Sequence, residues 1–345
     1  MKRVLIISSL FSFVIADLID TNCINKRYND WLDKFNLTYV NNKEMYSTWL
    51  DNDKYINEIN SLNLSYKLDH NVFSSLSHYE FDKLMRFNDN KKYFIKKQKN
   101  THANNININR DNFINNVRTV RKNNPYSIDW RGILQPIQNQ GNCGSCWAFS
   151  VACSIEAVNK IQNNVSIKLS EQYLVDCSNI KNRNSNGKNL GCKGGNIDTT
   201  FTWIKENNGM CENNDYPYTS GDTGKSTKCK QCNKIYGTNI NGFVNVKPNS
   251  NLDLITALTL NPVSVAIDAS SRDFQLYSSG VFGGKCNSDL NHAVNIVGYV
   301  QDKYYILRNS WGESWGENGY MLLQIDETLE SGLCGVLSMP SYPVY

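Results

Sequence analysis

The sequence predicts an α+β protein whose helices and strands are segregated along the chain. Helical patterns occupy roughly residues 146–230, where an apolar stretch runs from Trp147 through Val158. Short apolar runs typical of strands follow at 263–267, 293–297, 304–307 and 320–323. Segregated elements of this kind are typical of α+β folds. With 345 residues, 40% of them hydrophobic, the chain can bury one or two cores.

The N-terminus has the features of a signal peptide. Met1-Lys2-Arg3 supplies the charged start, an apolar run extends from Val4 to Ile15, and Ala16 suits a cleavage site. The run is shorter than the ~20 residues that span a bilayer, which disfavours the alternative of a membrane anchor. We therefore expect a signal peptide at 1–16, entry into the secretory route, and a final location that is lysosome-like, vacuolar or extracellular.

Residues 17–123 are expected to form a separate helical region that ends in a linker. Trp49, Asn52, Ile56 and Asn60 are spaced by 3, 4 and 4 residues, which places them on one side of a helix. Residues 96–124 are rich in Asn, Lys and Arg and contain neither Gly nor Pro, a composition that indicates a solvated linker. An amphipathic helical domain of unrelated purpose is the alternative.

Charge is distributed unevenly between the two parts of the chain. Residues 1–124 carry 19 Lys and Arg against 13 Asp and Glu (+6), and residues 125–345 carry 17 against 19 (−2). Attraction between the parts is therefore expected, and it should weaken in salt. The total of +4 is too small to indicate nucleic-acid binding.

The run from Gln140 to Ser150 contains a candidate nucleophile, because Cys146 directly precedes the apolar helical stretch. The positive end of a helix dipole favours thiolate over thiol at such a position. A nucleophile of this kind needs a base and a group that orients the base. His292 is the one histidine outside the polar N-terminal region, and Asn309 follows it by 17 residues. The sequence thus predicts a triad of Cys146, His292 and Asn309.

These motifs resemble the papain family of cysteine proteases, in its cathepsin L branch. Cys143-Gly144-Ser145-Cys146-Trp147 matches the family signature, and His292 follows Cys146 by 146 residues, close to the family spacing. The resemblance covers the whole chain. The 49–60 pattern is similar to the second half of the Glu-Arg-Phe-Asn-Ile-Asn motif of family propeptides, although Asn41 and Met45 replace its Glu and Arg.

The resemblance implies a papain-like fold of two subdomains, one helical and one β-barrel-like, with a helical N-terminal propeptide. Residues 17–123 would be an inhibitory propeptide with linker, laid through the cleft as an intramolecular inhibitor, and residues 124–345 the peptidase domain. In the second propeptide motif Asp69 and Ser75 replace the usual Gly and Asp. Processing is therefore expected to depend less sharply on acid than in relatives.

The resemblance also implies a role for each site residue. Cys146 would form a thioester acyl-enzyme, while His292, cationic in a resting ion pair, would protonate the leaving amine. Asn309 would orient His292, Trp311 would shield that contact, and Gln140 with the Cys146 N–H would form the oxyanion hole. The implied substrate-binding residues are Gly194, Gly195, Ile197, Ala266, Leu290, Trp311 and Met339. Of these, Ile197, Ala266, Leu290 and Met339, all apolar, would form the pocket for the second residue before the scissile bond (S2).

Eleven cysteines in a secreted chain indicate disulfides. The resemblance implies the bonds Cys143–Cys192 and Cys286–Cys334. Cys177 would pair with Cys229 or Cys232, and Cys211 with the remaining one. Cys153 is expected to be a buried free thiol, and Cys23 has no expected partner.

Two other classes of protein compete with a protease. Cys143-x-x-Cys146 and Cys229-x-x-Cys232 could form a split zinc site, but the interval between them far exceeds finger spacing. A catalytically silent papain-like binding protein is the second alternative, although all of the predicted catalytic residues are present. We therefore predict a monomeric cysteine endopeptidase that acts on proteins and peptides without a metal or other cofactor. Endopeptidase is favoured because no insert that would capture a chain terminus is recognisable.

Overall fold

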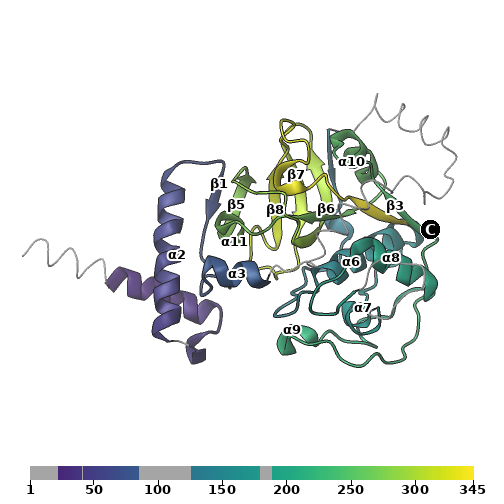
Figure 1. Cartoon of the computed structure of the whole chain (residues 1–345), viewed down its shortest axis with the longest axis horizontal. Helices are drawn as coiled ribbons and strands as arrows, with labels where there is room; N and C mark the ends of the chain where they lie inside the picture. The colour runs from purple at the N-terminus through teal and green to yellow at the C-terminus, as the bar shows by residue number, and fades with distance from the viewer. Residues whose placement is uncertain (1–21, 41, 85–125, 179–188) are drawn as a thin grey trace, which may run out of the picture.

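The computed structural model describes residues 22–40, 42–84, 126–178 and 189–345. The predicted signal peptide and most of the predicted linker lie outside these residues. Figure 1 shows the N-terminal region at one end, the sheet in the middle and most of the helices of the C-terminal domain at the other end. None of the helices in the described part of the chain combines the length and apolar character that a membrane crossing requires.

The N-terminal region is built mainly from helices. Residues 22–34 are helical, and η1 (Thr38–Val40), α2 (Lys43–Ser61) and α3 (His78–Leu84) follow. Trp49, Asn52 and Ile56 are buried on one side of α2, and Asn60 hydrogen-bonds to the backbone N–H and C=O of Leu68. The predicted one-sided spacing on this helix is confirmed.

One part of the N-terminal region forms a strand, which the sequence analysis did not predict. β1 (Tyr66–Leu68) pairs antiparallel with β5 (Tyr277–Phe282) of the C-terminal domain, with Tyr66 opposite Gly280. Three residues are too few to show a strand periodicity. The strand exists because β5 offers an edge whose backbone groups need partners.

The helical part of the C-terminal domain packs around one central helix. η2 (Arg131–Ile133) precedes α6 (Cys146–Asn163) along the chain. α7 (Glu171–Cys177) and α8 (Ile197–Glu206) pack against α6, and α9 (Ser220–Thr223) follows them in sequence. α6 is buried on every side from its first residue through Asn159. A helix enclosed in this way holds its first residue, Cys146, in a fixed position.

The sheet has the strand order β1-β5-β8-β7-β6-β4-β9-β3, with β2 also pairing with β6. All four predicted strands are present. The structure also contains strands and helices that were not predicted from the sequence. For example, β9 contains Pro343, which disfavours a strand prediction, and α11 has only five residues, too few for a helical pattern. The bounds are β2 (Ser127–Asp129), β3 (Gly242–Asn245), α10 (Asn251–Leu258), β4 (Val263–Ile267), α11 (Arg272–Leu276), β6 (His292–Val300), β7 (Tyr304–Arg308), β8 (Tyr320–Gln324), η3 (Leu333–Gly335) and β9 (Ser341–Val344).

Four disulfides are formed, and they resolve the pairing that the sequence left open. The bonds are Cys143–Cys192, Cys177–Cys229, Cys211–Cys232 and Cys286–Cys334. A cysteine in a disulfide is not a zinc ligand, so the split zinc site is ruled out. Cys153 is a buried free thiol, as expected, and Cys23 is free and exposed.

Candidate active site

The predicted nucleophile and base lie on opposite walls of the C-terminal domain. Cys146 begins α6, His292 begins β6, and Asn309 directly follows β7. Polar side chains fasten the two walls together. Asn295 of β6 donates to the Ser150 carbonyl of α6 (3.0 Å), and the hydroxyl of Ser150 donates to the Val294 carbonyl (2.9 Å). These buried bonds fix the register between the helix and the strand, and hence the placement of Cys146 relative to His292.

The hydrogen bonds around Asn309 determine the tautomer of His292. His292 Nε2 lies 2.8 Å from Asn309 Oδ1, and the backbone N–H of Ser310 donates to the same atom (2.8 Å). A backbone N–H is always a donor, so this atom of Asn309 is the oxygen. Nε2 therefore carries the proton, and Nδ1 is the nitrogen left to exchange a proton with a partner.

Trp311 covers the His292–Asn309 contact and is itself covered by the N-terminal region. Its ring stacks on His292 with centroids 4.6 Å apart at 27°. Phe73 and Phe81 pack edge-on against the same ring at 5.1 and 5.5 Å. The N-terminal region thus rests directly on the side chain that shields the predicted base.

Gln140 is held at each of its polar groups. Its N–H donates to the Ser310 carbonyl (2.8 Å), and its side-chain oxygen accepts from the Ser310 hydroxyl (2.7 Å). Its Nε2 donates to the Cys143 carbonyl (3.0 Å), which leaves a second N–H of that amide for another acceptor. Ser310 therefore joins Gln140 to Asn309, a connection that the sequence analysis missed.

Burial controls the protonation of the nucleophile and the base in this structure. It raises the pKa of the Cys146 thiol to about 11, against smaller lowering effects of the backbone N–H groups of Ala293, Trp147 and Cys146. It also lowers the pKa of His292 to about 4, although the hydrogen bond to Asn309 acts in the opposite direction. Both shifts disfavour the charged forms while the N-terminal region is in place, because burial outweighs the hydrogen bonds that favour them. The resting ion pair of the processed enzyme stays a prediction.

Three of the predicted substrate-pocket residues share one apolar cluster. Ile197 and Ala266 are buried in it, and Leu290 packs against it. Met339 is partly exposed and lies just before β9. Ser264 of β4 pairs with Ser341 of β9, so Met339 lies two residues before the position at which β9 meets β4.

The glycine pair at 194–195 lies against the start of α6. A Cβ at Gly195 would come within 2.4 Å of the Trp147 ring, so no side chain fits there. Gly194 has a φ of 107°, a conformation that favours glycine. These two residues bring bare backbone close to the position that follows Cys146.

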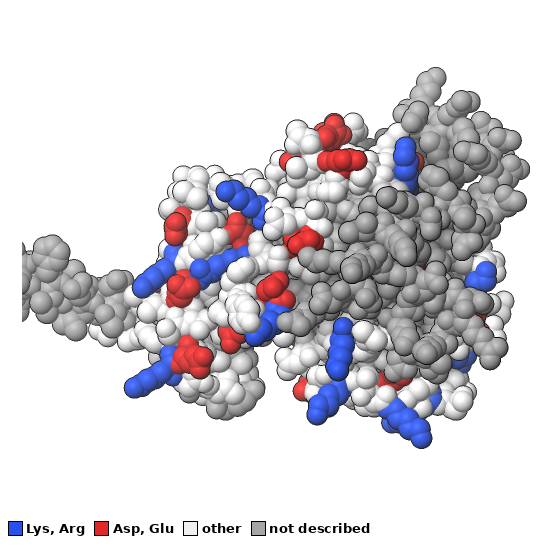
Figure 2. All heavy atoms as spheres, viewed as in Figure 1, with Lys and Arg blue, Asp and Glu red and all other residues white. Residues whose placement is uncertain are grey.

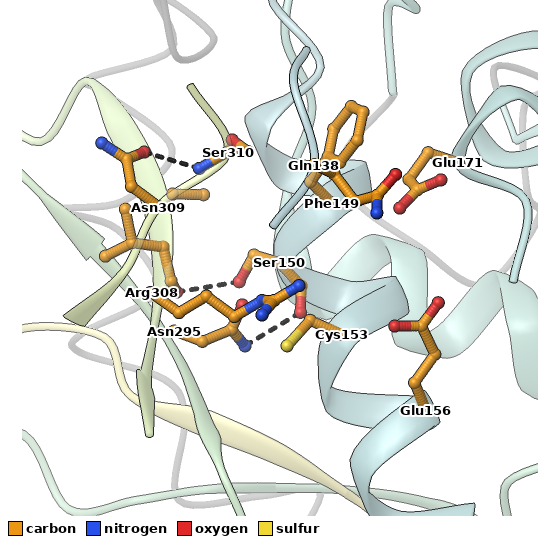
Figure 3. A pocket seen from close by; sticks show the side chains of 12 residues that line it. Gln138, Phe149, Ser150, Cys153, Glu156, Glu171, Asn295, Arg308, Asn309 and Ser310 are labelled. Carbon is orange, nitrogen blue, oxygen red and sulfur yellow. Dashed lines mark hydrogen bonds between the residues drawn. The ribbon is translucent and has the colours of Figure 1, made fainter. Parts of the chain in front are cut away.

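A cavity of about 20 Å³ lies behind these residues, between α6 and the sheet (Figure 3). Glu156, Glu171 and Arg308 line it together with Cys153. The two carboxylates are compensated by Lys168, which lies 3.2 Å from Glu156 and also pairs with Glu171. The cavity has room for about one water molecule. Cys146 and His292 do not line this cavity, whereas Asn309 and Ser310 do, so it lies behind the predicted catalytic residues.

The N-terminal region also contacts the C-terminal domain through polar side chains. Asp273 accepts hydrogen bonds from the hydroxyls of both Tyr55 and Tyr66. Arg272 donates to Asn52 (2.7 Å) and pairs with Asp51 (2.5 Å). The ion pair thus joins a cation of the C-terminal domain to an acid of the N-terminal region.

The described part of the N-terminal region does not carry the basic charge on which the expected attraction between the two parts of the chain depends. Residues 22–84 carry 7 Lys and Arg against 9 Asp and Glu. The basic excess belongs to segments outside the described residues. Figure 2 accordingly shows acidic and basic side chains intermixed over the N-terminal region.

Comparisons with known proteins cover both regions of the chain. A family model described as papain family cysteine protease matches residues 124–344, and one described as cathepsin propeptide inhibitor domain matches residues 28–81. Cysteine protease XCP2 of Arabidopsis thaliana is 36% identical over 344 residues, covering 97% of this chain and 90% of that protein. Cysteine protease 1 of Oryza sativa subsp. japonica is 46% identical over 228 residues, covering 64% of this chain but only 45% of that relative.

Solved proforms share the arrangement of the chain. The proform of Amb a 11, described as a cysteine protease and a major ragweed pollen allergen, has a TM-score of 0.77 at 30% identity, covering 93% of this chain and 94% of that one. Recombinant stem bromelain precursor has a TM-score of 0.77 at 31% identity, covering 93% and 98%. The similarity therefore includes the N-terminal region as well as the C-terminal domain.

Proposed function

Because the chain belongs to the papain family of cysteine proteases, we propose that its processed domain is an endopeptidase that uses Cys146, His292 and Asn309. The observation that carries this proposal is the geometry at His292. Its Nε2 is bound to Asn309, which leaves Nδ1 free to exchange a proton with the thiol at the start of α6. The proposed boundaries are a signal peptide at 1–16, a propeptide at 17–123 and the peptidase domain at 124–345.

The proposed reaction proceeds through an acyl-enzyme. Departure of the propeptide admits water, which moves both pKa values back towards a thiolate and an imidazolium. The Cys146 thiolate attacks the scissile carbonyl carbon, and His292 gives its proton to the leaving amine as the C–N bond breaks. A water then attacks the thioester while His292 removes its proton. The acid product leaves and the thiol is regenerated.

We assign the oxyanion hole to the free amide N–H of Gln140 and the backbone N–H of Cys146. Support comes from the fixed position of Gln140, whose other polar groups already have partners. A donor fixed before the reaction stabilises the negative oxygen without a reorganisation cost, and each such donor contributes on the order of 10²–10³ in rate.

The endopeptidase assignment is tested with a peptide blocked at both ends. An internally quenched peptide that lacks a free amine and a free carboxylate is cleaved only by an endopeptidase. We expect the processed protein to cleave it and the Cys146→Ala protein not to. Activity restricted to peptides with a free terminus would replace this assignment with an exopeptidase.

We expect the S2 pocket to favour Leu, Val or Phe over Arg by at least about tenfold in kcat/KM, a difference of about 1.4 kcal/mol. The proposed pocket, formed by Ile197, Ala266, Leu290 and Met339, contains no carboxylate. A guanidinium buried there would remain unpaired, whereas burial of an apolar side chain contributes roughly 1.5–3 kcal/mol. Fluorogenic dipeptides that differ at this position measure the preference.

Substitutions at Met339 identify the pocket. Met339→Glu should reduce the difference in kcat/KM between apolar and Arg substrates, because its carboxylate can pair with the guanidinium. Met339→Gln has a similar length without the charge and should keep the apolar preference, as should Met339→Leu. Equal cleavage of Leu and Arg substrates by the unmutated enzyme would show that the pocket lies on other residues.

The N-terminal region is a propeptide inhibitor domain by its family match and acts as an intramolecular inhibitor. We propose that it does so partly through the contact of Phe73 and Phe81 with Trp311, which keeps the His292 ring away from water. The N-terminal region is held against the C-terminal domain by the pairing of β1 with β5 and by the hydrogen bonds from Tyr55 and Tyr66 to Asp273. The proposed course of the next segment through the cleft falls outside the described residues.

The propeptide core contains a histidine that changes the expected response to acid. His70 Nε2 lies 3.1 Å from Asp53 Oδ1, and its ring stacks on Trp49 at 4.2 Å. Burial lowers the pKa of His70, more than Asp53 and Asp69 raise it, and Arg27 adds to the lowering. Ser75 removes one acid-sensitive group of the family motif, and we propose that His70 supplies another. The weaker acid dependence expected from Ser75 stays a prediction.

The propeptide should lose stability as the pH falls below about 6.5. The folded pKa of His70 lies below this unfolded value, so the unfolded propeptide binds more protons in that range. Hydrogen exchange of α2 amides in the Cys146→Ala zymogen should show less protection at pH 5 than at pH 7. His70→Gln keeps a donor for Asp53 and should reduce this difference, whereas His78→Gln, at an exposed histidine, should preserve it. An unchanged difference in His70→Gln would refute the assignment.

We propose that the chain enters the secretory route and reaches a lysosome-like, vacuolar or extracellular location as a monomer. The start of the sequence supports the route, and the four disulfides fit an oxidising compartment.

A further inference from the structure

We propose that Tyr218 is a positioning residue for the oxyanion hole, because its single hydroxyl holds the segments that carry both donors. This inference rests on the function proposed above, in which those donors are the Gln140 amide and the Cys146 N–H. Tyr218 lies far from both in sequence, and its hydroxyl bonds to Gln140 and Ser145 and not to the Cys146 thiol.

The hydroxyl of Tyr218 makes two hydrogen bonds whose directions are determined. It donates its one proton to the Gln140 carbonyl (2.8 Å). It lies 2.7 Å from the hydroxyl of Ser145, which must then be the donor in that contact. Ser145 is fully buried and immediately precedes Cys146. One oxygen thus links the residue of one oxyanion donor to the neighbour of the other.

The Tyr218 ring is fixed by its surroundings. Phe149 of α6, which also lines the interior cavity in Figure 3, packs edge-on against it with centroids 4.9 Å apart. The next two residues, Thr219 and Ser220, donate their N–H groups to the side chain of Gln172 (2.8 and 2.9 Å), which is buried on α7. The contacts with Phe149 and Gln172 therefore fix the position of the Tyr218 hydroxyl relative to the helical part of the domain.

The segment after Tyr218 also packs closely on the oxyanion loop. The N–H of Asn142 donates to the Gly221 carbonyl (2.8 Å). Gly141 has a φ of 57°, and a Cβ at that position would come within 2.6 Å of the Gly221 oxygen. The backbone at Gly141 and Asn142 therefore packs directly against the backbone at Gly221, and the bond from Tyr218 to Gln140 adds a side-chain contact between the same two segments.

This arrangement predicts an effect on the transition state and not on substrate binding. Oxyanion donors act only within about 2.7–3.1 Å of the position that the negative oxygen will occupy. Without the hydroxyl, the Gln140 carbonyl and the Ser145 hydroxyl lose a partner, and the loop between them is free to shift. The S2 contacts lie elsewhere, so kcat should fall while KM stays nearly constant.

The test compares Tyr218→Phe with Tyr216→Phe in the processed protein. Tyr216 belongs to the same Tyr-Pro-Tyr segment, but its hydroxyl donates to Asp176 (3.0 Å) and not to Gln140 or Ser145. We expect Tyr218→Phe to lower kcat about tenfold, equivalent to about 1.4 kcal/mol, with KM within about twofold. Tyr216→Phe should keep kcat within about twofold. Equal kcat losses in the two variants would overturn the proposal.

Two further measurements separate positioning of the oxyanion from an effect on the thiol. Alkylation by iodoacetamide needs the thiolate but no oxyanion hole, so its rate should be the same within about twofold in Tyr218→Phe. A fall in that rate as large as the fall in kcat would contradict the proposal. On a Gln140→Ala background, Tyr218→Phe should lower kcat by less than about threefold, because most of its effect passes through Gln140; a full tenfold loss there would also contradict it.

The outcome distinguishes this proposal from the proposed function. If Gln140→Ala lowers kcat strongly and Tyr218→Phe does not, only the role of Tyr218 fails. If Gln140→Ala leaves kcat unchanged, the assignment of the oxyanion hole itself is wrong, and the Tyr218 proposal fails with it.

Discussion

Replacing Cys146 with alanine is expected to reduce peptide hydrolysis by the processed protein to background while the domain remains folded. The substitution removes the only atom proposed to bond to the substrate, and no other described side chain in the site can replace it. Alanine is also well tolerated inside helices, so α6 should still begin at this position. Peptide turnover together with a thermal unfolding curve measures both expectations.

Cys153→Ala is the matched control for this prediction. Cys153 is the other buried free thiol of α6, and it lines the interior cavity. Its replacement should preserve peptide turnover. The free thiol of α6 that remains in Cys153→Ala is that of Cys146, the thiol that Cys146→Ala removes. Turnover that survives in Cys146→Ala would place the nucleophile on another residue.

His292→Ala should lower kcat/KM nearly as much as Cys146→Ala, because it removes the group proposed to activate the thiol and to protonate the leaving amine. Asn309→Ala should be distinctly milder and retain at least about tenfold more activity than His292→Ala. Asn309 only orients the ring, through the 2.8 Å bond to Nε2, and Trp311 still stacks on the other side of the contact. Steady-state kinetics of the two variants on one substrate provide the comparison.

The pH profile of the same variants adds a second criterion. Loss of an orienting partner changes the tautomer of His292 and should alter the pH dependence of the remaining activity in Asn309→Ala. Equal losses in Cys146→Ala, His292→Ala and Asn309→Ala would contradict this division of roles.

The catalytic residues could be proposed from the sequence because each has a local signal. Cys146 stands at a change from polar to apolar residues, and His292 is the one histidine in an apolar run. The resemblance to the papain family, now confirmed, added the expected roles of these residues and the fold. Among the predicted strands, β4 and β6 are buried along almost their whole length, and a largely apolar run marks each of them in the sequence.

The features that the sequence could not predict depend on contacts between distant residues. Tyr218 and Ser145 are 73 residues apart, and Ser310 and Gln140 are 170 apart, with no motif that connects them. The pKa values of Cys146 and His292 were expected to favour an ion pair because a helix dipole is visible in the sequence, whereas burial is visible only in the fold. His70 likewise gains its significance from Asp53 and Trp49, which lie on another element.

The most direct test of the central claim is turnover of a fluorogenic dipeptide, with Leu or Phe at the second position before the scissile bond, by the processed protein. We expect cleavage that is absent in Cys146→Ala and is blocked when a thiol-alkylating reagent modifies Cys146. A folded, correctly processed protein that binds such peptides but does not cleave them would contradict it and would identify the chain as a papain-like binding protein.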